Sequence, residues 1–206
     1  MRLVWAMLAR RACTLAWPCP DLFCDWLEAA LDADVREPHA ITLSTVDAAG
    51  RPTSRVLILK GLDDGRWHFA SSSASRKGKE IATNPWAAAN FYWPQLGRQV
   101  RLRGRILDAG PDASARDFLA RPPGSRAETL AGNQSAPLND PADLEHALAE
   151  AHARIHVDPE LVPEHWTLYH LLPDEVEFWQ AHPERRHARL RYRLDNGRWT
   201  RQTVWP

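Results

Sequence analysis

Short apolar segments separated by turn sequences recur along this chain, and their spacing limits the fold more than any other feature. The first two, residues 40–46 and 52–59, flank the turn sequence Asp47-Ala-Ala-Gly50, which is the pattern of a β-hairpin. Further expected strands are residues 67–70, 87–93, 98–107, 166–172, 175–180, 189–193 and 198–204. Closely spaced strands joined by short turns predict a mainly β, antiparallel barrel or sandwich.

Helices are expected around these strands. After Asp21, a possible N-cap, apolar residues recur at helical spacing up to Leu31, which is typical of a helix packed on a core. A second helix should begin at Ser75 and end near Asn84, and two more are expected over residues 111–119 and 140–155. Residues 121–138 are rich in Pro, Gly, Ser and Asn and are expected to be a loop.

The length of 206 residues suits one domain, and we expect it over residues 21–206, preceded by a mobile or loosely docked leader, residues 1–20. Lys and Arg number 26, as do Asp and Glu, so nothing in the net charge favours nucleic acid or a membrane as a partner. No apolar run approaches the ~20 residues that span a bilayer.

Cysteine usage favours a reducing, cytoplasmic compartment. Cys13, Cys19 and Cys24 are few, odd in number and without CxxC spacing, so neither a disulfide framework nor a metal site is expected.

Two groups of cations stand out in the chain. Arg55 and Lys60 flank four apolar residues of an expected buried strand, a costly arrangement unless an anion meets them. Arg76 and Lys77 follow Ser75 at the start of a helix, where cations oppose the helix dipole. An anion such as phosphate would compensate them. The alternative is a solvated basic helix face beside an ordinary core strand.

The order and spacing of several short motifs resemble those of a known family. The motifs are Arg55-Val-Leu-Ile-Leu-Lys60, Ser75-Arg-Lys-Gly78, Asn84-Pro85, Phe91-Tyr-Trp-Pro94, Arg98-Gln-Val-Arg101, Arg121-Pro122 with Ser125, Gln134-Ser135, Val176-Glu-Phe-Trp-Gln180, and Arg185, His187 and Arg189. Together they resemble the pyridoxamine/pyridoxine 5'-phosphate oxidase family over roughly residues 21–206. The resemblance implies an antiparallel FMN-binding split β-barrel with flanking helices, a homodimer with flavin at its interface, and a dimerisation and substrate-site region over residues 160–206.

The resemblance also implies the flavin contacts. These would be Arg55, Val56, Leu57, Ile58, Leu59, Lys60, Ser71, Arg76, Lys77, Gln99, Gln134, Ser135, Trp179 and Arg189. Arg76 and Lys77 would hold the FMN phosphate with help from Ser71. Gln99 would be an amide partner and Trp179 a wall against the ring. Taken alone, Trp179 would be read as core packing.

The substrate contacts implied by the resemblance fall into two sets. Lys60, Arg121 and Ser125 would bind the substrate phosphate. Arg185 and His187 would lie over the pyridine ring as catalytic residues, sharing one face if their segment is strand-like. Taken alone, residues 184–187 would be read as a solvated charged turn.

Some positions depart from the family pattern. Asp117 replaces a tyrosine four residues before Arg121, and a carboxylate there would repel a substrate phosphate. Leu130 replaces a tryptophan, Ala70 replaces an aromatic residue, and residues 1–20 contain no clear Arg-x-x-Tyr lid. The flavin half of the site is thus better preserved than the substrate half.

The activity implied is that of an FMN-dependent oxidase. It would convert pyridoxamine or pyridoxine 5'-phosphate to pyridoxal 5'-phosphate by hydride transfer to flavin, with O2 as acceptor and H2O2 released. One alternative is an oxidase of the same family with another substrate, as in phenazine pathways. The other is a non-catalytic flavin- or pyridoxal-phosphate-binding module.

Overall fold

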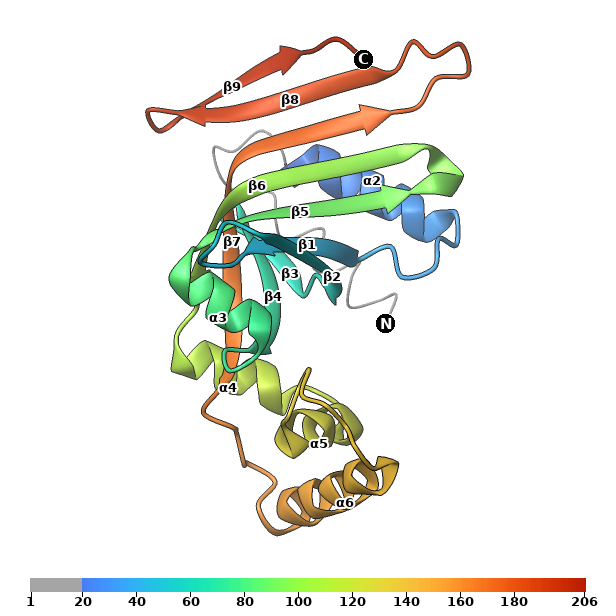
Figure 1. Cartoon of the computed structure of the whole chain (residues 1–206). Helices are drawn as coiled ribbons and strands as arrows, with labels where there is room; N and C mark the ends of the chain where they lie inside the picture. Colours follow the sequence, from blue (N-terminus) through green and yellow to red (C-terminus); the bar gives the residue numbers. More distant parts are fainter. Residues whose placement is uncertain (1–19) are drawn as a thin grey trace.

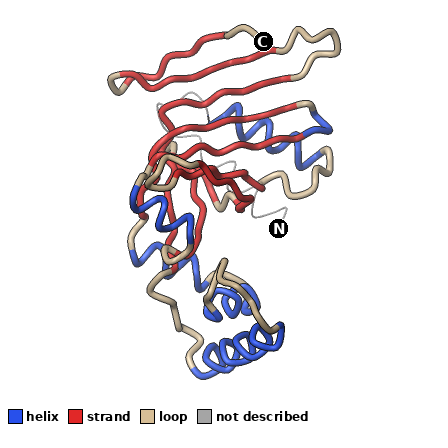
Figure 2. The backbone as a smooth tube through the Cα atoms, in the orientation of Figure 1, coloured by secondary structure: helices blue, strands red, loops and turns tan. Residues whose placement is uncertain are grey.

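A single curled antiparallel sheet organises the chain. It is seen in the computed structural model, which describes residues 20–206 (Figures 1 and 2). Its strands are β1 Ala40–Val46, β2 Pro52–Ile58, β3 Gly61–Asp63, β4 Arg66–Ser72, β5 Trp86–Trp93, β6 Arg98–Asp108, β7 Trp166–Gln180, β8 Ala188–Asp195 and β9 Arg198–Thr203. The helices are α2 Pro20–Asp32, α3 Arg76–Thr83, α4 Pro111–Leu119, α5 Pro123–Ala131 and α6 Pro141–Val157.

The sheet curls into a half-barrel whose two edges are not joined. Its order is β2-β1-β5-β6-β7-β4-β3, and the β8–β9 hairpin extends it from β7. Strand β7 pairs with β4 along its first half and with β8 along its second half, while β6 pairs with it from Tyr169 to Gln180. Figure 1 shows β7 bending between these halves, so that the hairpin projects away from the barrel.

The bend in β7 has a local cause in the sequence. The register of β6 against β7 shifts between Arg103 and Gly104, opposite Pro173. A Cβ added at Gly104 would lie 2.0 Å from the carbonyl oxygen of Leu172, so only glycine allows this approach. The expectation of two strands, 166–172 and 175–180, was therefore wrong, because the bulge lets one strand pass through the proline.

Aromatic residues from α2 and the sheet fill the barrel. Phe23 of α2 lies with its ring centroid 4.4 Å from that of Trp67 and 4.9 Å from that of Phe91, and all three side chains are buried. The predicted apolar stripe of α2 is thus confirmed as core. The expectation of a buried strand at residues 55–60 was wrong: β2 is an edge strand, with Val56 64% and Ile58 40% exposed.

Helices α5 and α6 form an arm at the end of the barrel opposite the C-terminal hairpin (Figure 1). The prediction of a loop over residues 121–138 was wrong for the first half of this segment, which forms α5. Prolines at the start of a helix are compatible with this, because their missing N–H groups would be unpaired there in any case. The side chain of Arg126 donates to the carbonyls of Pro159 and Leu161 and fastens α5 to the chain after α6.

Among the helices of residues 20–206, none is long and apolar enough to cross a membrane. The expected leader at residues 1–20 lies, apart from Pro20, outside the described residues.

Candidate functional site

Lys77 is the centre of the first set of predicted flavin residues. Its side chain is only 7% exposed, and its Nζ lies 2.8 Å from Ser71 Oγ and 3.3 Å from Gln134 Oε1. Burial, and then the charge of Arg55, lower the pKa of Lys77, while Glu80 raises it. An ammonium group that is buried among neutral oxygens lacks a counter-anion of its own, as expected of a group that binds one.

The helix that carries Lys77 begins as the sequence predicts. Ser75 is the N-cap of α3, and its Oγ accepts a hydrogen bond from the backbone N–H of Gly78. A Cβ on Gly78 would lie 2.4 Å from the carbonyl oxygen of Ser73, so the glycine lets the preceding loop lie directly on the helix. Ser71 and Lys77 are brought together by this contact.

Glu80 holds the neighbouring cations. Its carboxylate accepts from Arg76 Nε at 2.9 Å and lies 3.4 Å from Arg55 Nη2. Burial by itself raises the pKa of Glu80, but hydrogen bonds from Thr45, Thr53 and Arg76, with the charge of Arg55, lower it to about 2. The cost of burying Arg55 is therefore met by a carboxylate of the chain itself.

A cavity of about 620 Å³ opens beside this set. Its lining combines cations, two carboxylates and the turn after α5: Asp47, Ala48, Arg51, Ala74, Arg76, Lys79, Glu80, Thr83, Gln134, Ser135 and Ala136. Asn133 and Ser135 both have positive φ, 57° and 70°, and this tight turn brings residues 134 and 135 to the cavity.

The predicted substrate-phosphate residues form a second set around Trp166. Lys60 Nζ lies 2.7 Å from Asp117 Oδ1, and Trp166 Nε1 donates to Asp117 Oδ2 at 2.9 Å. The guanidinium of Arg121 stacks on the Trp166 ring, 4.1 Å from its centroid. Thr129 links Arg121 to Ser125: Arg121 Nη1 donates to its Oγ1, which donates to the Ser125 carbonyl. Lys60, Arg121 and Ser125 are thus brought together.

The predicted ring contacts lie in the turn between β7 and β8. His187 packs on Trp179 with ring centroids 4.9 Å apart, and its Nδ1 accepts from the backbone N–H of His182. Because Nδ1 is an acceptor, the proton of the neutral ring is on Nε2. Arg185 is exposed at φ 63°, so the expectation that it shares a strand face with His187 was wrong.

The remaining predicted flavin residues surround Trp179 on the sheet. Trp179 pairs with Gln99 of β6 and with Arg189 of β8. Arg189 donates from Nε and Nη2 to Glu177, a carboxylate that is 4% exposed and also binds Arg101. Glu177 therefore orients Arg189.

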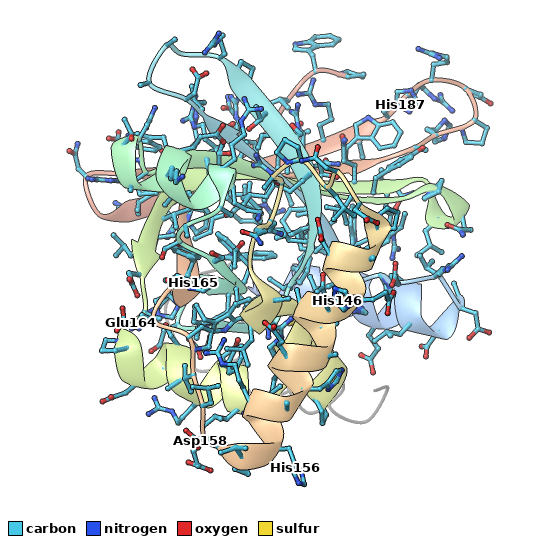
Figure 3. All side chains as sticks on the ribbon, turned by 60° about the horizontal axis from the view of Figure 1, so that its bottom comes forward. His146, His156, Asp158, Glu164, His165 and His187 are labelled. Atoms are coloured by element: carbon cyan, nitrogen blue, oxygen red, sulfur yellow. The ribbon has the colours of Figure 1, made fainter. Side chains whose placement is uncertain are left out.

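These residues lie far from Lys77 within one chain. Ser71 pairs with Thr167 at the start of β7, and Trp179 follows twelve residues later, which is about 40 Å along a strand at ~3.3 Å per residue. In Figure 3 His187 lies well apart from His165, which directly precedes Trp166. The predicted site is therefore divided into two halves in a single chain.

Residues 56–59 join Arg55 of the first set to Lys60 of the second, and their side chains differ in exposure. Val56 and Ile58 point to solvent, Leu57 is half-buried, and Leu59 is in the core. Their flavin contacts, like those of the whole predicted set, stay predictions. Sequence reasoning missed Trp166, Thr129, Glu80 and Glu177. Only Glu80 had a local signal, since it lies four residues after Arg76 on α3.

No metal centre accompanies these residues. Within residues 20–206, no three His, Cys, Asp or Glu side chains are grouped so that they could hold a metal ion.

Comparison of the sequence with family profiles accounts for nearly all of the described chain. The family described as pyridoxamine 5'-phosphate oxidase matches residues 27–162, and the pyridoxine 5'-phosphate oxidase C-terminal dimerisation region matches residues 166–206.

Individual relatives agree with the profiles. A pyridoxine/pyridoxamine 5'-phosphate oxidase from Ectopseudomonas mendocina is 45% identical over 187 residues, 90% of this chain and 87% of that protein. One from Burkholderia mallei is 45% identical over 170 residues, 82% of this chain and 79% of that protein.

Solved structures share the fold. PhzG from Burkholderia lata 383, in complex with tetrahydrophenazine-1-carboxylic acid, superimposes with a TM-score of 0.84 at 31% identity, over 95% of this chain and all of that one. A pyridoxamine 5'-phosphate oxidase-related, FMN binding protein from Nostoc punctiforme gives a TM-score of 0.78 at 20% identity, over 94% of this chain and all of that one. From the two profile matches and the 45% identity, the chain belongs to the pyridoxamine 5'-phosphate oxidase family, a family of oxidoreductases.

Proposed function

We propose that the chain is an FMN-dependent oxidase that acts as a homodimer. The observation that carries this is Lys77, a buried cation at the capped start of α3 with its Nζ near Ser71 and Gln134. The flavin phosphate would be the anion that this ammonium lacks.

The donor set fits FMN. Lys77 and Arg76 supply charge, Ser71 and Ser135 supply hydroxyl groups, and the N-terminus of α3 supplies backbone N–H groups. Gln99 and Arg189 would donate to the polar edge of the ring, and Trp179 would pack on its face. The chemistry supplied by FMN, when bound, is acceptance of a hydride from the substrate and return of the electrons to O2, forming H2O2.

Arg185 and His187 would orient the substrate ring. Arg185 is exposed and able to meet charge that develops on the substrate as the hydride leaves. His187 offers Nε2–H as a donor to an oxygen on the ring, because His182 fixes its other nitrogen as an acceptor.

A second copy of the chain would complete the site. Ser71, the partner of Lys77, pairs with the start of β7, whereas Trp179 lies near the end of β7, so the two predicted halves of one flavin site are separated in one chain. The match of residues 166–206 to a dimerisation region supports a dimer in which the C-terminal half-site of one copy meets the α3 half-site of the other.

Pyridoxine and pyridoxamine 5'-phosphate are the substrates to test first, since the 45% identical relatives carry those names. The test is an anaerobic titration of the FMN-loaded protein with pyridoxine 5'-phosphate, followed by flavin absorbance. Bleaching that reverses when air is admitted is the expected result. Flavin that stays oxidised with this and every other amine or alcohol tried would favour a non-catalytic flavin-binding module.

A different substrate within the same chemistry is the second candidate. It is favoured by the 2.7 Å contact of Asp117 with Lys60, which places a carboxylate on a predicted phosphate ligand. PhzG, the 31% identical neighbour, is bound to a phenazine carboxylic acid rather than a phosphate ester. Reversible bleaching by another compound, with pyridoxine 5'-phosphate inactive, would support this candidate.

A further inference from the structure

Asp117 forms an ion pair with the ammonium group of Lys60, and its carboxylate is held in place by Trp166. Its Oδ1 lies 2.7 Å from Lys60 Nζ, and its Oδ2 accepts the indole N–H of Trp166 at 2.9 Å. The Asp117 side chain is 13% exposed and Trp166 is 9% exposed. Moving Asp117 aside would leave the Trp166 N–H without its acceptor, so the carboxylate stays with Lys60 when a ligand arrives.

Arg121 is held on the other side of Trp166. It stacks on the indole ring at 4.1 Å, lies 5.8 Å from the Phe118 centroid, and donates from Nη1 to Thr129. Burial lowers the pKa of Arg121, while Asp117 and Glu128 raise it. Arg121 therefore keeps N–H donors free for a ligand, and Lys60 keeps the ammonium donors that Asp117 does not take.

The charges around Trp166 determine what this subsite can neutralise. Lys60 and Arg121 are two cations and Asp117 is one anion, so the three together carry a net charge of +1. Other charged or titratable groups on the surrounding elements are the exposed Glu128, Arg126, which is bound to two carbonyls, the exposed Asp112 and Arg116 of α4, and Glu164 and His165 just before Trp166. A dianion would bring one negative charge more than the subsite balances, close to a carboxylate held in place.

We propose that the Lys60–Asp117–Arg121 subsite selects a singly charged anionic group on the substrate. An aromatic carboxylate has this charge at neutral pH, and a phosphate monoester has it only below a second pKa of about 6. Asp117 is then the residue that determines specificity at this end of the substrate. The inference rests on the proposed function, because it assigns the substrate class of that same oxidase site.

The test compares two probes that share a ring and differ in charge. Benzoate and phenyl phosphate are titrated into the FMN-loaded protein by calorimetry at pH 7.5 and 5.5, a readout that needs no turnover. The variant Lys60→Met assigns the heat of probe binding to this subsite, because the variant should no longer give that heat.

Benzoate should bind more tightly than phenyl phosphate at pH 7.5. Binding of phenyl phosphate relative to benzoate should strengthen about 25-fold at pH 5.5, because the singly charged form rises from about 3% to about 76% of the ligand at a second pKa of about 6. Asp117→Asn should reverse the preference: phenyl phosphate should bind more tightly than benzoate at pH 7.5, and phenyl phosphate should bind this variant more weakly at pH 5.5 than at pH 7.5. The control Asp112→Asn, in the first turn of α4, which also carries Asp117, should behave as wild type.

Tighter binding of phenyl phosphate than of benzoate by the wild-type protein at pH 7.5 would overturn the inference, and so would heats that survive Lys60→Met. The wild-type comparison stands even if Asp117→Asn does not fold. Absence of flavin bleaching with every substrate would overturn the oxidase proposal but leave the ratio of the two probes intact. The two failures can therefore be told apart.

Discussion

Arg55 and Glu80, separated by 25 positions in the chain, meet with Arg55 Nη2 3.4 Å from Glu80 Oε2. Thr45 and Thr53 donate to the same oxygen from the β1–β2 hairpin. The contact ties the edge of the sheet to α3 and fixes the position of the helix whose N-terminus carries the proposed flavin-phosphate ligands.

Replacing Glu80 should change how stability depends on pH. The pKa of Glu80 falls from 4.5 to about 2 in the folded state, so its contribution is complete above pH 4.5 and is lost as pH falls towards 2. Wild type should lose about 2 kcal/mol more than Glu80→Gln between pH 6 and pH 3. Urea denaturation at the two pH values measures this. The exposed Glu150→Gln is the control, and equal losses in wild type and Glu80→Gln would contradict the assignment.

Lys77→Met should separate cofactor binding from folding. Because burial lowers the pKa of Lys77, its charge costs stability in the protein without cofactor, and methionine removes that cost. The variant without FMN should melt at or above the wild-type temperature. Its affinity for FMN should fall by about 10- to 100-fold, the worth of a charge-assisted hydrogen bond of roughly 1.5–3 kcal/mol.

Quenching of FMN fluorescence on binding measures the affinity of Lys77→Met, and a thermal melt with and without FMN measures the stabilisation. A variant that bound FMN as tightly as wild type would remove Lys77 from the proposed phosphate site.

The local features of the flavin-phosphate set could be predicted from the sequence, whereas the contacts within the substrate set could not. Ser75 as N-cap follows from its position before the helix, and the structure confirms it. Repulsion between Asp117 and a substrate phosphate was also expected from the sequence. The pairing of Asp117 with Lys60, 57 positions away, was not, because it depends on how α4 packs on β7. Trp166 had no signal at all, because its importance arises from a hydrogen bond across 49 positions.

Two elements were mispredicted for the same reason, which is that a distant contact overrode local composition. Proline and glycine made residues 121–131 resemble a loop, yet Arg126 ties them as α5 to carbonyls more than 30 positions away. Pro173 suggested a break in β7, yet the bulge at Gly104 accommodates it.

Arg185→Ala should slow turnover and leave FMN binding intact, because Arg185 is assigned to the substrate ring and not to the flavin. Loss of one preorganised cation at a developing charge typically lowers kcat by about 10²-fold or more. Arg186→Ala is the matched control, since the neighbouring side chain is also exposed and pairs with Glu184. Steady-state oxidation of a compound that reversibly bleaches the wild-type flavin, with FMN titration alongside, measures both. Equal rates for Arg185→Ala and wild type would exclude Arg185 from catalysis.

Two defective variants should restore activity when they share a dimer. Lys77 belongs to the α3 half-site and Arg185 to the C-terminal half-site, and Figure 1 shows α3 well apart from the turn that follows β7. In a mixed dimer of Lys77→Met and Arg185→Ala, one site would carry both changes and the other neither.

If co-expressed chains pair at random, half of the dimers are mixed, and activity should reach about a quarter of the wild-type value. Co-expression with two different affinity tags and purification through both gives the mixed dimer, which should have about half the wild-type activity. A doubly tagged dimer no more active than the two parents would show that each site is built within one chain, and would overturn the proposed joining of the two half-sites across the interface.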